Sequence, residues 1–157
     1  SLLALFPEVE EALVTAVITH TLKPSGIYKL DSKYRDKPER GTLEFDGGTV
    51  RVKTDTSTRD YPTPQSIEAP LTVYIRILVV HSAPTGKASD VALCLLGYLE
   101  SFLKLRSDYE WSAVLAYHMA FFARCHHEMA SGSYVGWKTM DSELQGEFLV
   151  GFRKVRV

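Results

Sequence analysis

The chain has only two cysteines, Cys94 and Cys125, which lie 31 residues apart in apolar stretches. Two cysteines are too few for a disulfide scaffold or for a zinc site built from four thiolates. A free cysteine behaves as a small hydrophobic side chain. We therefore expect both cysteines to be reduced core residues of an intracellular protein.

Long hydrophobic runs are also absent. The longest, Leu71–Val80, is interrupted by Thr72 and Arg76 and falls short of the ~18 apolar residues that a membrane span needs. The apolar N-terminus lacks the basic residues that begin a signal peptide. We expect no membrane association. Because the first residue is Ser1 rather than Met, we also expect the chain to be part of a longer polypeptide.

An excess of charge of one sign is missing as well. Lys and Arg together number 18 and Asp and Glu 19, which gives a formal net charge of −1. This balance disfavours a stand-alone nucleic-acid binder that works by neutralising phosphates. With 157 residues, 45% of them hydrophobic, the chain is long enough to bury a core without a metal or disulfide.

What the sequence does contain is apolar spacing typical of helices. It predicts a mainly α protein, a compact bundle of about five helices that forms one domain over residues 1–157. The expected helices cover residues 8–22, 66 or 68 to about 81, 87–106 and 109–131, and a short last helix capped by Asp141. Gly132 is expected to end the fourth helix. The second of these helices is expected to bury an apolar stripe, and so is the third. The two stripes are Ile67, Leu71, Tyr74, Ile75 and Leu78, and Val91, Leu95, Tyr98, Leu99, Phe102 and Leu103. The short connections predict that successive helices pack antiparallel.

Residues 23–65 differ from the rest, and we expect a polar insert within the helical domain. Residues 42–53 alternate polar and apolar side chains around Asp46-Gly47-Gly48. Because such a turn supplies the positive φ angles of a tight hairpin, the pattern predicts one β-hairpin at residues ~42–53. The remainder of the insert is predicted to be loop.

Catalytic and metal-binding patterns are scarce. His118 and Cys125 fall on one predicted helix, about 11 Å apart along its axis, which is too wide for one metal ion without further ligands. No Gly-x-Ser-x-Gly motif and no phosphate-binding glycine motif occur. We therefore expect no catalytic residue, metal site or cofactor. A small hydrolase or metalloprotein centred on His118 and Cys125 is kept as an alternative.

The basic residues support a second alternative, an RNA- or DNA-binding module with a basic loop and a basic C-terminus. Nine of the 18 cationic residues lie between residues 23 and 60, but seven carboxylates are interleaved with them. Because the carboxylates offset most of that charge, we favour a solvated surface there. The candidate contacts to phosphates are Lys29, Lys33, Arg35, Lys37, Arg40, Arg153, Lys154 and Arg156.

Aromatic residues in predicted loops suggest a protein interface. Tyr61, Tyr134 and Trp137 fall outside the predicted helices, where an aromatic side chain either seals the end of a core or forms an interaction hot spot. Leu3 and Phe6 belong to an apolar N-terminus that could dock against another chain. These five residues are our candidates for contacts with a second copy or another protein.

A wider pattern of residues covers about two-thirds of the chain. It comprises Lys23-Pro24, Tyr28 to Asp31, Tyr61-Pro62, Pro70-Leu71 with Tyr74, Tyr109 to Leu115, Tyr117-His118, Glu128-Met129, Gly132-x-Tyr134-x-x-Trp137 and Asp141-x-x-Leu144. In these residues the chain resembles the gag-like, capsid-region proteins of fungal retroelements. The resemblance implies a small helical bundle without catalysis that self-associates into shells around the element's RNA. The Cys-x₂-Cys-x₄-His-x₄-Cys zinc knuckle that usually contacts RNA is missing. The resemblance therefore implies that this RNA-binding module is either absent or lies outside this chain, where segments could contact RNA.

Overall fold

The computed structural model describes residues 1–33, 42–46, 49–53 and 59–155, and of residues 42–46 and 49–53 it describes the main chain alone. The α-helices of this part are α1 (Glu11–Ile18), α2 (Gln65–Ser82), α3 (Ala88–Asp108), α4 (Trp111–Ala130) and α5 (Ser142–Phe148). Four short 3₁₀ helices accompany them, η1 (Leu3–Leu5), η2 (Pro24–Leu30), η3 (Ala83–Thr85) and η4 (Val135–Lys138). The predicted mainly helical class is confirmed.

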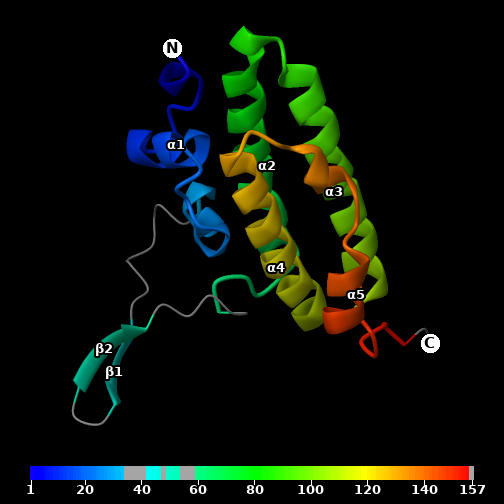
Figure 1. The fold of residues 1–157 in the computed structure, drawn as a ribbon. Coiled ribbons are helices and arrows are strands. Elements are labelled where there is room, and N and C mark those ends of the chain that lie inside the picture. Colours follow the sequence, from blue (N-terminus) through cyan, green and yellow to red (C-terminus); the bar gives the residue numbers. More distant parts are fainter. Residues whose placement is uncertain (34–41, 47–48, 54–58, 156–157) are drawn as a thin grey trace.

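The helices α2, α3 and α4 form the body of the molecule, and α2 lies between α1 and α3 (Figure 1). The 3₁₀ helix η2 packs against α2 and α4, while η4 covers α3 and α5 covers α4. Because α2 has neighbours on several sides, it buries more than one narrow stripe. The residues predicted to form the apolar stripe of this helix are all buried, namely Ile67, Leu71, Tyr74, Ile75 and Leu78. Ile77 is buried as well.

Individual residues at the helix ends determine where the helices begin and stop. The side chain of Asp141 accepts a hydrogen bond of 3.0 Å from the amide of Leu144, which confirms it as the N-cap of α5. Gly132 has a φ of +91° just after α4, the left-handed conformation that glycine adopts without strain. The first helix is shorter than predicted, since α1 spans Glu11–Ile18 and His20 has a φ of +56°. That left-handed residue turns the chain away from the helix axis.

The polar segment 23–65 also differs from the expected insert. Residues 24–30 form η2, whose Ile27 and Leu30 are buried, and Tyr61 is fully buried before α2 begins. Both ends of the segment therefore belong to the helical core, because their apolar side chains gain by leaving water. The expected hairpin falls on the main-chain strands β1 (Thr42–Asp46) and β2 (Thr49–Lys53). They pair antiparallel, with Thr42 opposite Lys53.

The centre of the core is aromatic. The rings of Tyr98 and Phe121 stack with centroids 4.6 Å apart, and the Trp137 ring meets Tyr98 and Phe122 edge-on at 5.1 and 5.0 Å. Offset stacks and edge-to-face pairs are the favourable aromatic arrangements. The indole N–H of Trp137 donates to the sulfur of Met129 at 3.3 Å. The core thus joins α3, α4 and η4 through one continuous set of rings.

Candidate interaction surface

The outer face of α3 is the most apolar exposed surface on any one described helix. Leu93, Leu96 and Leu103 are exposed to 69, 52 and 41%. The opposite face of α3 is buried against the rest of the protein, through Val91, Leu95, Tyr98, Phe102 and Leu105. A surface helix normally carries polar residues opposite its buried stripe. Helix α3 instead carries leucine on both sides.

Two of the exposed leucines, Leu96 and Leu103, belong to a regular seam along α3. Ala92, Leu96, Leu99 and Leu103 follow each other at spacings of four, three and four residues, and Ala92 and Leu99 are half-buried. This is the spacing of the a and d positions of a coiled coil, which bring apolar side chains onto one line along a helix. We call these four residues the α3 seam. Leu99 packs partly against the core, so the seam offers another helix chiefly the side chains of Leu96 and Leu103.

Polar groups flank the α3 seam without covering it. Glu100 and Lys104 form an ion pair of 3.7 Å, and their side chains are 74 and 75% exposed. Such an exposed pair contributes little to stability. At the inner side of the helix, Arg106 pairs with Glu68 of α2, which ties the end of α3 to the bundle. The seam is therefore presented by a helix held firmly in place.

A second group of exposed apolar side chains lies beside the C-terminal end of α3. Val150, Phe152 and Val155 are exposed to 73, 44 and 88%. Their segment is fastened to the junction between α3 and α4, because the amide of Glu110 donates to the carbonyl of Phe152 and the amide of Lys154 to that of Asp108. The apolar surface of α3 is thus followed by apolar residues in a fixed C-terminal turn.

The structure corrects most of the interface residues expected from sequence. Phe6, Tyr61 and Trp137 are 2, 0 and 1% exposed, so these side chains seal the core and offer no surface for a partner. Leu3 and Tyr134 are half-buried and pack against the core. The loop positions of these aromatics suggested exposure, but their large apolar areas favour burial.

Tyr61 shows why a loop aromatic becomes part of the core. Its hydroxyl donates to the carbonyl of Ser25 at 2.5 Å and accepts from the amide of Tyr28 at 3.2 Å. The indole N–H of Trp111 donates to the Tyr61 carbonyl at 2.8 Å. These bonds satisfy the polar atoms of the residue, so burial of its ring carries little polar cost.

The basic residues proposed for phosphate contacts are only partly described. Lys29 is half-buried and Lys33 is exposed. The guanidinium of Arg153 lies 5.1 Å from the ring centre of Tyr109, and the ammonium of Lys154 donates to the carbonyl of Arg106 at 2.9 Å. The described C-terminal cations therefore make contacts within the chain. Arg35, Lys37, Arg40 and Arg156 lie outside the described residues.

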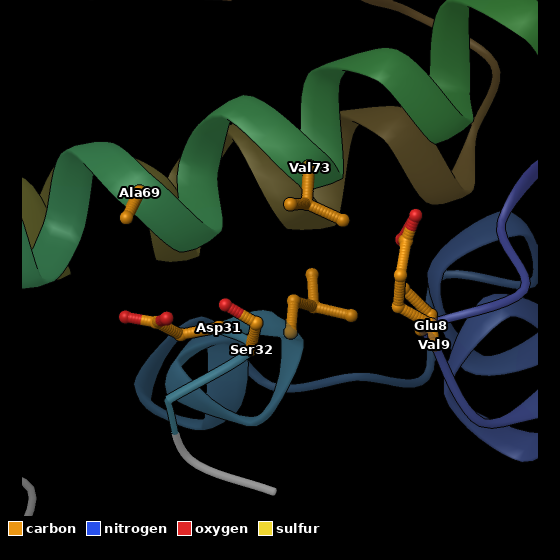
Figure 2. Close-up of a pocket in the computed structure, with 7 residues that line it drawn as sticks. Glu8, Val9, Asp31, Ser32, Ala69 and Val73 are labelled. Carbon is orange, nitrogen blue, oxygen red and sulfur yellow. The ribbon is translucent and has the colours of Figure 1, made fainter.

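A surface pocket of about 280 Å³ lies between the end of η2, the start of the chain and α2. Figure 2 shows the carboxylates of Glu8 and Asp31 on either side of the hollow, with Ala69 and Val73 of α2 forming one wall. The lining residues are Glu8, Val9, Leu30, Asp31, Ser32, Ala69 and Val73. Two carboxylates repel phosphate groups, so this pocket does not suit a nucleic acid.

The residues of the catalytic alternative are in the core. His118 and Cys125 are 0 and 1% exposed. The Nδ1 atom of His118 shares a hydrogen bond of 2.6 Å with the Tyr98 hydroxyl, and burial lowers the pKa of His118 to about 3. Burial also raises the pKa of the Cys125 thiol to about 12. Both groups are thus held in their neutral forms, away from solvent.

A second histidine pair lies nearer the surface. The rings of His20 and His126 are 6.4 Å apart, and His20 also meets the ring of Tyr134 at 6.2 Å. Burial lowers the pKa of both histidines, and repulsion from His126 and His81 lowers the pKa of His20 further. No group of three or more histidine, cysteine or carboxylate side chains suited to a metal ion occurs within the described ranges.

Comparison of the chain with protein-family models, with curated proteins and with solved structures finds no match. A search of the described helices finds none that is both long and apolar enough to cross a membrane. The surface of α3 was not among the sequence-based candidates. Its signal was nonetheless present, because α3 contains leucine at positions 93, 95, 96, 99, 103 and 105, more than a single buried stripe can use.

Proposed function

We propose that this chain is a non-enzymatic interaction protein that self-associates through the outer face of α3, in the manner of a gag or capsid-like assembly protein. The observation that carries the proposal is the exposure of Leu93, Leu96 and Leu103 on one helix face. Isolated exposed apolar residues are common on protein surfaces, but three large ones on one side of a single helix are more than the other described helices expose. The gag-like residue pattern agrees with this role, since it implies a helical protein that assembles with copies of itself.

The size of the patch predicts weak association. The exposed parts of the three leucines amount to about one and a half leucine side chains, and burying one side chain contributes about 1.5–3 kcal/mol. Two chains together would gain about 5–10 kcal/mol from these leucines. Association costs about 4–15 kcal/mol in lost freedom of motion. At most about 6 kcal/mol remains, which corresponds to a dissociation constant no tighter than about 40 µM. An assembling protein can strengthen such a weak contact by using several at once.

Sedimentation velocity tests the proposal over a concentration range from about 10 µM to 1 mM. We expect the weight-average sedimentation coefficient of the wild-type chain to rise with concentration, and the Leu96→Ser variant to remain a monomer. A matched control is Leu5→Ser, because Leu5 is exposed to 58% and lies on η1, on the other side of α2 from α3 (Figure 1). This control should associate as the wild type does. A wild-type chain that stays monomeric throughout would refute the proposal.

A further inference from the structure

We propose that the partner of the α3 seam is the seam of a second copy, lying antiparallel, with a two-fold axis passing between residues 97 and 98. This inference rests on the proposed self-association and specifies its geometry. An isologous contact of this kind uses the same surface on both chains, so it closes as a dimer. The seam residues Ala92, Leu96, Leu99 and Leu103 are arranged symmetrically about that axis.

The spacing of the seam makes it complementary to itself. In the antiparallel arrangement Leu96 faces the partner's Leu99, and Leu99 faces the partner's Leu96. At the two ends Ala92 faces the partner's Leu103, and Leu103 faces the partner's Ala92. Each layer then pairs an a position with a d position, as antiparallel coiled coils do. The small alanine always meets a large leucine, so the two outer layers are filled equally.

A parallel dimer in register fits less well. It would set Ala92 against the partner's Ala92 and Leu103 against the partner's Leu103, which leaves one layer underfilled and crowds another. It would also align the dipoles of two helices of 21 residues, whereas the antiparallel arrangement places opposite ends side by side. Packing and electrostatics therefore both favour the antiparallel pair.

Charges beside the seam are compatible with this arrangement. Leu93, exposed to 69%, lies on the same side of the seam as Glu100, one heptad earlier. In the antiparallel dimer it lies next to the partner's Glu100. The methylene groups of that glutamate cover the leucine, and its carboxylate remains paired with the lysine four residues further along its own helix, as in the single chain. No charge has to be buried without a partner.

The length of the contact sets its strength. Helix α3 is about 31 Å long, and four layers use its central part only. Such a contact buries less than the ~800 Å² per chain of a standard stable interface. A weak, reversible dimer is therefore expected. We expect Leu96→Ser, which removes two of the four layers, to raise the dissociation constant at least about tenfold.

Spin labels distinguish the possible arrangements. Single cysteines are introduced by Ser107→Cys or Glu100→Cys, two exposed positions on the outer side of α3, and each carries a nitroxide. The native Cys94 and Cys125 are 6 and 1% exposed, so the wild-type chain serves as the control for unwanted labelling. At 1.5 Å per residue, the antiparallel axis separates the two positions 107 by about 30 Å along the helices and the two positions 100 by only about 8 Å.

Pulsed electron resonance on the Ser107 label and line broadening on the Glu100 label are measured at concentrations where sedimentation shows dimers. A long distance at position 107 with strong broadening at position 100 supports the proposal, together with loss of the dimer in Leu96→Ser. Equally short distances at both positions would overturn the antiparallel arrangement in favour of a parallel one. A dimer unaffected by Leu96→Ser would overturn the seam while leaving self-association intact. Absence of any dimer would overturn both proposals.

Thermal melting followed by circular dichroism tests whether a variant loses the dimer only because its chain unfolds. Because Leu96 is 52% exposed, its replacement should leave the melting curve of the monomer close to that of Leu5→Ser. Loss of dimer together with an unchanged monomer melt assigns the effect to the interface. If Leu96→Ser unfolds the chain, Leu103→Ser gives the same test at the other exposed residue of the seam, and a dimer that persists in that variant would contradict the proposed contact.

Discussion

The buried histidine of the core makes acid sensitivity a direct test of the structure. His118 is 0% exposed and makes one hydrogen bond, from Nδ1 to the Tyr98 hydroxyl, while its Nε2 atom has no partner among the described residues. Burial lowers its pKa from 6.5 to about 3. Between pH 6.5 and about pH 3, the His118 imidazole is therefore protonated in the unfolded chain and neutral in the folded chain. Stability is complete above about pH 7 and is lost as the pH falls through 6.5 toward 3.

The size of the loss follows from linkage. Each pH unit below the unfolded pKa of 6.5 costs about 1.4 kcal/mol for one group that stays neutral in the folded state. A pH of 5.0 lies about 1.5 units below the unfolded pKa of 6.5, so His118 alone lowers the free energy of unfolding by about 2 kcal/mol relative to pH 7.5. That is a large part of the 5–15 kcal/mol typical of a domain.

Urea unfolding at pH 7.5 and pH 5.0 measures this effect in the wild type and in His118→Asn. Asparagine keeps a polar atom near the Tyr98 hydroxyl and does not titrate. We expect the drop in unfolding free energy between the two pH values to be about 2 kcal/mol smaller in the variant. His20 and His126, whose pKa values are also lowered, contribute equally to both proteins and cancel. Identical drops in both proteins would refute a neutral His118 in the core, and His118→Gln provides a second variant if asparagine is too destabilising.

Two further predictions concern the C-terminal helix and the thiols. Asp141 caps α5 and pairs with Arg124, so Asp141→Ala should lower the free energy of unfolding by about 1–2 kcal/mol in urea titrations. Asp141→Asn should lose less, because asparagine also caps helices, and equal losses would show that the cap contributes nothing. Cys94 and Cys125 are buried, and the pKa of Cys125 is raised to about 12. A thiol reagent at pH 8 should therefore react slowly with the native chain and with two thiols per chain in denaturant; rapid reaction of both without denaturant would contradict their burial.

Sequence patterns anticipated the parts of this fold that depend on regular spacing. The stripe from Ile67 to Leu78 predicted the buried face of α2, and Gly132 and Asp141 marked a helix end and a helix start as the structure has them. These signals are local, because a cap or a glycine acts on the turn beside it. They can therefore be interpreted without knowledge of the rest of the chain.

Other features depend on contacts that no local pattern records. Helix α1 ends before His20, a histidine in the left-handed conformation that usually requires glycine. Trp137 was expected in a loop, yet η4 places it against rings from α3 and α4. In both cases tertiary packing selects a conformation that the neighbouring residues do not specify.

The interaction surface shows the same limit. Periodicity placed Leu103 on the inner face of its helix, but the structure leaves it 41% exposed. Since leucine occurs on most sides of α3, a sequence alone cannot assign which leucines face the core. The neighbours of the helix decide which leucines are buried, because α2, α4 and η4 pack against α3 and leave its remaining side to solvent.

The hydrogen bonds of Tyr61 have a consequence for how the gene can vary. They fasten residues 25 and 28 to residue 61, so two segments far apart in the sequence are held together at one side chain. One substitution at this position therefore acts on both segments at once, because a single hydroxyl group holds them. Tyr61 should accordingly tolerate replacement far less well than an exposed neighbour such as Thr63.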